Sequence, residues 1–549
     1  MSKRLSIGEY LLEQLHRHGV RHIFGVPGDY VLGFYELIGK SRVRHVGMTR
    51  EDAAGFAADA YARVEGMGAA VVTYCVGGFS IANPTAGAYA EKSPVVVISG
   101  APGMAERERN PLLHHRVRDF STQREVFAHL TVANAALDDP LTAYDEIDRV
   151  LHAVERYKRP GYIELPRDMV SATHAHEHRD RSLESMTDAA ALAECMGEIT
   201  RMVNASRRPV ILAGEEVHRF GLQDALVRLV EKLRVPVAAT ILGKSVIRES
   251  HPLYLGVYEG AMGSDAVRRR VESADCLLML GCFMTDINLG VYTAKLEANR
   301  TIYATSEKLS VRRHAFEDVP FQSFFKALLS ANLKRRAAPR MPKPPRTGPV
   351  RAADSQRVTM RTLFPILNGV LTDDMAVISD IGDCLFGAID MRIQRRSEFL
   401  GPAYYTSMGF AVPAAVGVQT AKPHLRPMVL VGDGAFQMTG MELSTVARLG
   451  LNPIVVVLNN HGYSTERQIL DGPFNDILNW RFTKVPELLG AGRAFRACTV
   501  GELRAALAAA IANTKSFSLV EVELDPYDAS PAMRRLGERL GKRVKGKTT

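Results

Sequence analysis

One segment, residues 431–460, constrains the fold more than any other part of the chain. An apolar run ends in the tripeptide Gly-Asp-Gly at 432–434, and a second apolar run at 454–458 ends in two asparagines, 459–460. The sequence between them predicts a helix at about residues 440–449. A buried strand, a glycine turn, a helix and a second buried strand in this order are typical of a parallel α/β sheet.

Both predicted strands end in side chains that carry hard oxygen atoms. Asp433 is flanked by Gly432 and Gly434, which let a phosphate approach the backbone, and Asn460 follows the second strand. Open α/β sheets bind ligands at the carboxyl ends of their strands. A carboxylate and an amide oxygen suit Mg²⁺ or Ca²⁺. Gly-Asp-Gly alone more often marks a plain turn, but the complete unit predicts a metal-bound diphosphate.

The complete unit, with 24 residues between Gly434 and Asn459, resembles the diphosphate and metal motif of thiamin-diphosphate enzymes. The resemblance implies thiamin diphosphate and Mg²⁺ as cofactors. It also implies that the metal ligands are Asp433, the side-chain oxygen of Asn460 and the backbone carbonyl of Gly462. The residues that it places beside the diphosphate are Gly382, Asp383, Gly432, Gly434 and Ala435.

The length and the pattern of the chain predict three α/β domains. The 549 residues suffice for about three domains of ordinary size. Helical and apolar strand patterns alternate in each third, so we expect three consecutive doubly wound parallel sheets. The predicted domains are residues 1–180, 185–333 and 357–549, with a polar stretch at 171–184 and a proline-rich basic linker at 334–356.

The net charge of +9 does not indicate a nucleic-acid-binding protein. Most of it comes from two segments, 334–351 and 534–549, which hold seven Lys/Arg each and only one acidic residue, Glu538. Neither segment has interleaved aromatic residues or a groove-reading motif, so we interpret them as a solvated linker and a basic C-terminal tail. We also expect reduced thiols, no signal peptide, no membrane span and a cytoplasmic location.

Three α/β blocks with this unit in the last one resemble thiamin-diphosphate-dependent 2-oxo acid decarboxylases, and most closely their pyruvate and indolepyruvate branch. The family order is a pyrimidine-binding, a central and a diphosphate-binding domain. Glu51 matches the glutamate that hydrogen-bonds to the aminopyrimidine and assists removal of the C2 proton. The alternative is that residues 49–52 only form a helix capping box. Met408 resembles the bulky apolar residue that holds the pyrimidine over the thiazolium, and Thr406 matches a residue that offers its backbone carbonyl to the 4'-amino group.

Four further residues match the proton-transfer groups of this branch: Asp29, His114, His115 and Glu466. Each has an ordinary alternative, because Pro-Gly-Asp is a turn, paired histidines are often solvated, and Glu466 can cap the following helix. Together, these carboxylates and imidazoles suit acid–base chemistry near neutral pH. Acetolactate-synthase-like carboligases should lack the adjacent histidines and Glu466, which makes that alternative weaker.

The expected substrate is a bulky 2-oxo acid. Pyruvate enzymes narrow their pocket with large aromatic residues, and the corresponding positions here are Ile287 and Leu385. The resemblance therefore implies an aromatic or long-chain substrate such as phenylpyruvate or indolepyruvate, with branched-chain 2-oxo acids and pyruvate left open. Because the first and third domains of different chains meet in relatives, we also expect a homodimer or homotetramer with shared active sites.

Overall fold

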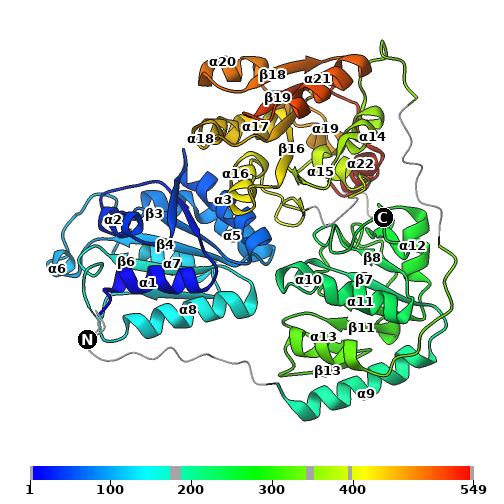
Figure 1. The fold of residues 1–549 in the computed structure, drawn as a ribbon, viewed down its shortest axis with the longest axis horizontal. Helices are drawn as coiled ribbons and strands as arrows, with labels where there is room; N and C mark the ends of the chain where they lie inside the picture. The colour runs from blue at the N-terminus through cyan, green and yellow to red at the C-terminus, as the bar shows by residue number, and fades with distance from the viewer. Residues whose placement is uncertain (1–3, 174–186, 342–350, 394–397, 545–549) are drawn as a thin grey trace.

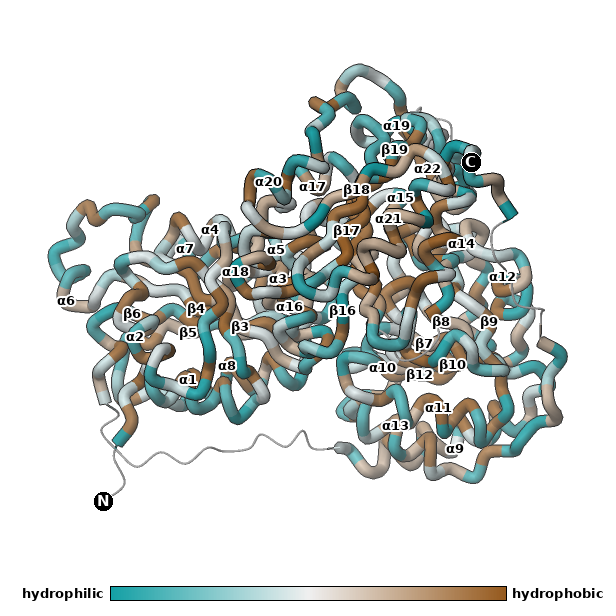
Figure 2. The backbone as a smooth tube through the Cα atoms, turned by 45° about the horizontal axis from the view of Figure 1, so that its top comes forward, coloured by the Kyte–Doolittle hydropathy of each residue, from teal (hydrophilic) through white to brown (hydrophobic). Residues whose placement is uncertain are grey.

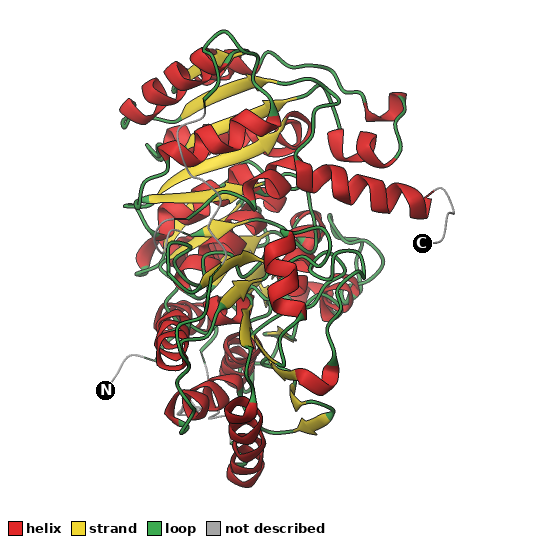
Figure 3. Cartoon of the chain, turned by 90° about the vertical axis from the view of Figure 1, so that its right-hand side faces the viewer, coloured by secondary structure: helices red, strands yellow, loops and turns green. Residues whose placement is uncertain are grey.

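Three β-sheets lie in three successive parts of the chain. The computed structural model describes residues 4–173, 187–341, 351–393 and 398–544. Figure 1 shows the first part in blue and cyan, the second in green, and the third, in yellow to red, above and between them. Figure 3 shows the strands between layers of helices. The prediction of three α/β domains with mostly parallel sheets is confirmed.

The first sheet has six parallel strands in the order β2-β1-β3-β4-β6-β5. Its strands are β1 (His22–Gly25), β2 (Arg44–Gly47), β3 (Gly68–Val72), β4 (Val95–Ala101), β5 (Ala133–Ala136) and β6 (Gly161–Pro166). Its helices are α1 (Ile7–Arg17), α2 (Leu32–Lys40), α3 (Glu51–Glu65), α4 (Val76–Ser80), α5 (Ala82–Ala90), α6 (Met104–Arg107), α7 (Thr122–Ala128) and α8 (Ala143–Tyr157).

The second sheet is parallel except for a hairpin at one edge. The order is β13-β12-β11-β10-β7-β8-β9, and β12 pairs antiparallel with both β11 and β13. The elements are α9 (Ala189–Ala205), β7 (Pro209–Ala213), α10 (Glu215–Arg219), α11 (Gln223–Leu233), β8 (Val237–Ala239), β9 (Tyr254–Val257), α12 (Asp265–Glu272), β10 (Cys276–Leu280), β11 (Thr301–Ala304), β12 (Leu309–Val311), β13 (His314–Phe316) and α13 (Phe321–Ser330). The second sheet is therefore mostly parallel, with an antiparallel hairpin at one edge.

The third sheet is parallel, in the order β15-β14-β16-β17-β19-β18. Its strands are β14 (Met375–Ser379), β15 (Phe399–Leu400), β16 (Arg426–Gly432), β17 (Ile454–Asn459), β18 (Arg493–Ala497) and β19 (Ser518–Glu523). Its helices are α14 (Met360–Val370), α15 (Asp383–Ala388), α16 (Ala411–Ala421), α17 (Asp433–Thr439), α18 (Leu443–Arg448), α19 (Ser464–Ile469), α20 (Val485–Leu489), α21 (Val500–Ala512) and α22 (Pro531–Val544).

The helix between β16 and β17 differs from the prediction. It begins directly at Asp433, because Gly432 has the extended backbone of an N-cap residue (φ −71°, ψ 156°). A 3₁₀ turn at Gly440–Glu442 then divides it into α17 and α18. The prediction for the polar stretch at 171–184 falls mostly outside the described residues. Within the linker, the described residues 334–341 and 351–356 form neither helix nor strand.

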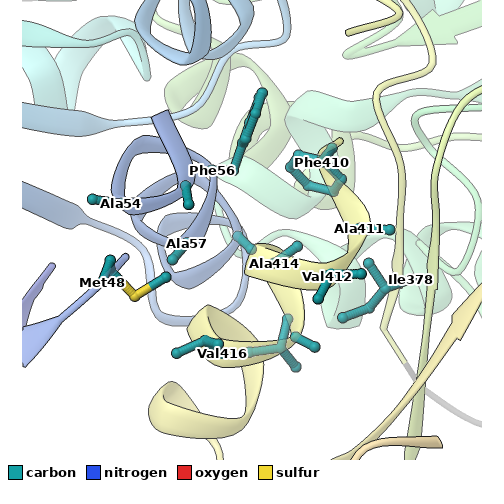
Figure 4. Close-up of a cluster of buried hydrophobic side chains, with 14 of the residues drawn as sticks. Met48, Ala54, Phe56, Ala57, Ile378, Phe410, Ala411, Val412, Ala414 and Val416 are labelled. Atoms are coloured by element: carbon teal, nitrogen blue, oxygen red, sulfur yellow. The ribbon is translucent and has the colours of Figure 1, made fainter. Parts of the chain in front are cut away.

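The first and third domains share one hydrophobic core. Figure 2 shows apolar residues concentrated along the strands and on the helix faces that cover them. Helix α3 crosses α16 closely, and the Phe56 ring of α3 meets the ring of Phe410, the N-cap residue of α16, edge to face at a centroid distance of 5.9 Å (Figure 4). A methyl group at Gly417 would lie 2.1 Å from the backbone oxygen of Ala57, so this crossing requires glycine. The helix that begins at Glu51 is therefore fixed against the third domain of the same chain.

Buried charges join all three domains near residues 91 and 92. The Glu91 carboxylate accepts hydrogen bonds from the backbone N–H groups of Tyr404 and Tyr405 at 2.8 and 2.9 Å, and it pairs with Arg63 at 2.8 Å. Lys92 pairs with Glu216 of the central domain at 3.0 Å. The buried Lys92–Glu216 pair is formed only while the first and central domains stay together. Among the described residues, no helix is long and apolar enough to cross a membrane.

One buried carboxyl group at this junction predicts a pH dependence of stability. Glu215 is fully buried, and burial raises its pKa to about 8. The folded chain therefore holds this proton at a pH where the unfolded chain has lost it. The stabilising contribution is complete below the unfolded pKa and is lost as the pH rises towards 8, with a slope of up to about 1.4 kcal/mol per pH unit.

We expect Glu215→Gln to flatten this part of the stability curve, measured by urea unfolding of the cofactor-free protein from pH 5 to 8. Glu36→Gln, at an exposed site, is the control and should leave the slope unchanged. An unchanged slope in Glu215→Gln would contradict the assignment.

Candidate active site

A cavity of about 490 Å³ opens at the carboxyl ends of β14, β16 and β17. The parallel register pairs Gly432 with Leu458, so the residues that follow the two strands come side by side. The predicted site residues in the lining are Ile287, Gly382, Asp383, Thr406, Met408, Gly432, Asp433, Gly434, Ala435, Asn460, Gly462 and Glu466. The structure thus brings most of the predicted cofactor residues together.

Asp433 and Asn460 form the polar centre of this cavity. Both are buried, at 2% and 4% exposure. The Asp433 carboxylate accepts the backbone N–H of Gly434 at 2.8 Å and that of Gly462 at 3.0 Å. The Asn460 Oδ1 atom is buried, and no described residue donates a hydrogen bond to it. Burial raises the pKa of Asp433 to about 6.

These residues fit a divalent cation. A buried acceptor without a donor destabilises a fold, and so does a buried carboxylate without a cation. A hard metal ion would satisfy both groups at once. Gly462 has φ +141°, and a methyl group there would lie 2.1 Å from the Asn475 carbonyl, so only glycine allows this turn beside Asp433. The assignment of Mg²⁺ remains a prediction.

The loop with Thr406 and Met408 is held against the third sheet. The Asp380 carboxylate accepts hydrogen bonds from the N–H groups of Gly409 at 3.2 Å and Ala411 at 3.0 Å. Thr406 has a left-handed backbone, with φ +59°. Met408 is half-buried and lines the cavity. This placement suits an apolar support for a ring, and the role of Met408 as a wedge remains a prediction.

The first domain brings together three of the four predicted proton-transfer residues, Asp29, His114 and His115. His114 Nε2 lies 2.8 Å from Asp29 Oδ2, and the His114 and His115 rings lie 4.9 Å apart. The Tyr30 ring stacks on His114 with a centroid distance of 4.8 Å. All three predicted residues are exposed. None of them lines the third-domain cavity of the same chain, which contains the fourth predicted group, Glu466.

Glu51 is the first residue of α3, and the capping-box alternative is wrong. Arg50 is the N-cap residue and makes no side-chain capping bond. Thr49 instead donates its backbone N–H to buried Glu442 of the third domain at 3.1 Å, and its hydroxyl bonds to the same carboxylate. Glu51 is half-buried and does not line the cavity. Its carboxylate is therefore not committed to capping this helix.

The placement of Leu385 in the substrate pocket is wrong for this cavity. Leu385 is fully buried in the core and lies outside the lining, while its neighbours Cys384 and Phe386 are in it. Successive helical residues point about 100° apart, so α15 turns Leu385 away from the cavity, towards Gly401. An aromatic side chain, Phe386, takes the place that we predicted for leucine.

The C-terminal segment contributes a wall that sequence reasoning missed. Residues 531–544 form α22 rather than a solvated tail, and Leu536 and Leu540 line the cavity together with Ile469 of α19. Figure 3 shows this helix beside the C-terminus. Met533, Leu536 and Leu540 follow the spacing of one apolar helix face. That signal was present in the sequence, although the seven basic residues of 534–549 obscured it.

Three α/β domains with a carboxylate and an amide oxygen at the ends of adjacent parallel strands define a class of diphosphate-cofactor enzymes. Comparison with known sequences identifies the family. Residues 5–122 match the N-terminal TPP binding domain of thiamine pyrophosphate enzymes, residues 196–331 match their central domain, and residues 380–522 match their C-terminal TPP binding domain. The chain belongs to the thiamine pyrophosphate enzyme family, which confirms the predicted family and cofactor.

Curated relatives align over nearly the whole chain. An indole-3-pyruvate decarboxylase from Azospirillum brasilense is 37% identical over 523 residues, which cover 94% of this chain and 95% of that protein. An alpha-keto-acid decarboxylase from Mycolicibacterium paratuberculosis is 38% identical over 530 residues, 94% of each chain. An alpha-keto-acid decarboxylase from Mycobacterium tuberculosis is 36% identical over 546 residues, covering 98% of this chain and 97% of that protein.

Proposed function

We propose that this enzyme decarboxylates a 2-oxo acid without oxidation, giving an aldehyde and carbon dioxide. The observation that carries the proposal is the buried pair of Asp433 and Asn460, with its unsatisfied acceptor, in the same cavity as Glu466. The names of the relatives, indole-3-pyruvate and alpha-keto-acid decarboxylases, support the same reaction.

Each side of the site has its own task. Bound thiamin diphosphate supplies the electron sink that decarboxylation of a 2-oxo acid requires. Asp433, the Asn460 side chain and the Gly462 carbonyl would hold Mg²⁺, while the glycines around them let the diphosphate approach the backbone. Glu51 would exchange a proton with the aminopyrimidine. Met408 would offer the cofactor an apolar surface in the cavity wall.

The remaining acids and imidazoles would handle protons at the substrate. Asp29 orients His114 through the 2.8 Å contact. The imidazoles of His114 and His115 can donate or accept a proton, as protonation of the product carbon and release of the aldehyde require. Glu466 lies on the α19 turn just after the metal-binding loop, where it can act on the same substrate.

We expect Glu466→Gln and His114→Ala to lower kcat by roughly 10²-fold or more while cofactor binding is retained, because each removes one acid–base group. Turnover is followed by aldehyde release, and cofactor binding by the thermal shift with thiamin diphosphate and Mg²⁺. Glu125→Gln, on helix α7 of the first domain, is a suitable control. Normal aldehyde release from either variant would exclude the corresponding role.

We also propose a homodimer, or a tetramer built from dimers, in which the first domain of one chain completes the cavity of the other. Within one chain, Glu51 and the Asp29–His114–His115 group lie outside the cavity lining. Apolar side chains are exposed on both domains that would form the site: Val76 of the first domain at 54%, and Met438 and Met441 of the third at 46% and 38%. Such surface is normally covered in an assembly.

Mixing two inactive variants tests shared sites. Chains with Glu51→Gln and chains with Asp433→Asn are co-expressed. If the sites are shared, each mixed dimer has one intact site, so the mixture should recover roughly a quarter of wild-type activity by random pairing. Sites within single chains would recover none. Sedimentation should show dimers or tetramers, and an active monomer would contradict the proposal.

For the substrate, we propose an aromatic or long-chain 2-oxo acid such as phenylpyruvate or indolepyruvate. The cavity walls are largely apolar, with Ile287, Phe386, Leu536 and Leu540 among them. A branched-chain 2-oxo acid or pyruvate is the second candidate. The cavity is lined by Phe386 and not by the smaller Leu385 that we predicted, which leaves less room for the substrate side chain. Aldehyde formation from pyruvate, 2-oxoisovalerate, phenylpyruvate and indolepyruvate decides between them. Acyloin as the main product would indicate a carboligase instead.

A further inference from the structure

Helix α22 packs on α19 at a distance that only glycine permits. A methyl group at Gly537 would lie 2.7 Å from Gln468 Cβ and 2.8 Å from the Gln468 carbonyl oxygen. A methyl group at Gly541 would lie 2.9 Å from the Ile469 carbonyl oxygen. Residues four apart share one helix face, so both glycines present backbone to the same short helix. The contacts are with backbone and Cβ atoms, which cannot move aside as a flexible side chain would.

This contact determines the distance between two walls of the cavity. Leu536 and Leu540 directly precede the two glycines and line the cavity from α22, while Glu466 and Ile469 line it from α19. The same cavity contains two buried oxygen atoms without a described donor, Asn460 Oδ1 and Asp383 Oδ1. It is therefore a ligand site, and the separation of the two helices sets its width.

The N-terminal half of α22 is fixed by other bonds. The Asp383 carboxylate accepts the backbone N–H of Ser530 at 2.7 Å, and the Ser530 hydroxyl accepts that of Met533 at 3.1 Å. Arg535 donates to the Met262 carbonyl of the central domain at 2.6 Å. Beyond Leu536, the described hydrogen bonds from α22 to other elements end, and the glycine contacts remain. A change at Gly541 should therefore move Leu540 more than Leu536.

We propose that Gly537 and Gly541 are positioning residues for substrate specificity. By holding α22 against α19 they keep Leu536 and Leu540 close to Ile469, which limits the length of the 2-oxo acid side chain that the cavity accepts. This inference rests on the proposed function for its substrates. A methyl group at either glycine moves the helix outwards and widens the cavity.

The test compares Gly541→Ala and Gly537→Ala with wild type as holoenzymes. The measured quantity is the ratio of kcat/KM for indolepyruvate to kcat/KM for pyruvate. We expect this ratio to rise by about tenfold, because a change of one methylene in an apolar pocket alters discrimination by about that factor or more. Gly541→Ala is the milder variant, since its methyl group meets a single carbonyl oxygen.

Gly369→Ala is the matched control. Gly369 lies in α14 of the same domain, and a methyl group there meets nothing within 4 Å. Its ratio should equal that of wild type. Hydrogen exchange of the backbone amides of residues 531–544 in the cofactor-free protein is the second measurement. The exchange rate should increase in Gly541→Ala and Gly537→Ala and stay unchanged in Gly369→Ala.

The results separate this inference from the proposed function. An unchanged ratio in Gly541→Ala, whatever the total activity, overturns the inference, and so does unchanged exchange in α22. A wild-type enzyme that converts no 2-oxo acid overturns the proposed function instead. In that case the exchange comparison still decides whether the glycines hold the helix.

Discussion

Replacing Asn460 with leucine is expected to abolish the thermal stabilisation by thiamin diphosphate and Mg²⁺ and to reduce turnover to background. The Asn460 Oδ1 atom is buried without a described donor, and in the cofactor-free protein this costs about 1–3 kcal/mol. Leucine has a similar size and removes that cost. The free energy of unfolding of the cofactor-free variant should therefore stay equal to that of wild type or increase, while a ligand at 100 times its Kd no longer adds about 2.7 kcal/mol.

Asn459, the residue before Asn460, provides the control for the Asn460→Leu variant. Asn459 is also buried, and its Oδ1 atom likewise has no described donor, but its side-chain amide donates to Asn479 at 3.0 Å and to Glu521 at 2.8 Å, and the residue does not line the cavity. Asn459→Leu should lower the stability of the cofactor-free protein and retain the stabilisation by cofactor. Differential scanning fluorimetry with and without cofactor measures both quantities. A normal cofactor shift in Asn460→Leu would remove this residue from the metal site.

Exchanging Glu51 for glutamine is expected to lower kcat by about 10²- to 10⁴-fold and leave the fold intact, because an amide cannot exchange a proton with the aminopyrimidine. The carboxylate makes no capping bond in α3, so its loss should change stability little. Turnover of the best substrate is the first measurement. Hydrogen–deuterium exchange at C2 of the bound cofactor is the second, because it isolates the step that we assign to Glu51.

Asp52→Asn removes the same charge from the same helical turn. Asp52 is half-buried and bonds to Arg50 at 3.0 Å and to the backbone of Ala53 at 2.8 Å, which are local structural contacts. We expect its kcat to remain near that of wild type. Near-normal activity in Glu51→Gln, or an equal loss in both variants, would contradict a specific role for Glu51.

The parts of the site that follow from local pattern were predictable. Two buried strands around one helix are commonly parallel neighbours, and β16 and β17 do pair directly, which brings Asp433 and Asn460 together. The grouping of Asp29 with His114 came from a family resemblance, because residues 85 positions apart meet only through the tertiary fold. The capping-box alternative failed for the same reason, since Thr49 is bound by Glu442 from another domain.

Two features depended on details that sequence patterns do not contain. Leu385 and Phe386 are adjacent, and only the rotation of α15 on the sheet decides which of them faces the cavity. The basic residues of 534–549 suggested a solvated tail, yet residues 531–544 form α22, which packs against α19. In both cases the packing of a whole element outweighed the character of its individual residues.

The ion pairs around Glu91 and Lys92 restrict how this architecture can be rearranged. Lys92 of the first domain pairs with Glu216 of the central domain, and Glu91 of the first domain accepts two backbone N–H groups of the third domain, so each contact would be lost if one domain were exchanged for that of a distant homologue. A chimaera would therefore have to import both partners of every such pair. Replacing a whole domain by that of a homologue is for this reason a poor route to new variants of this enzyme. Engineering is better directed at the walls of a single cavity.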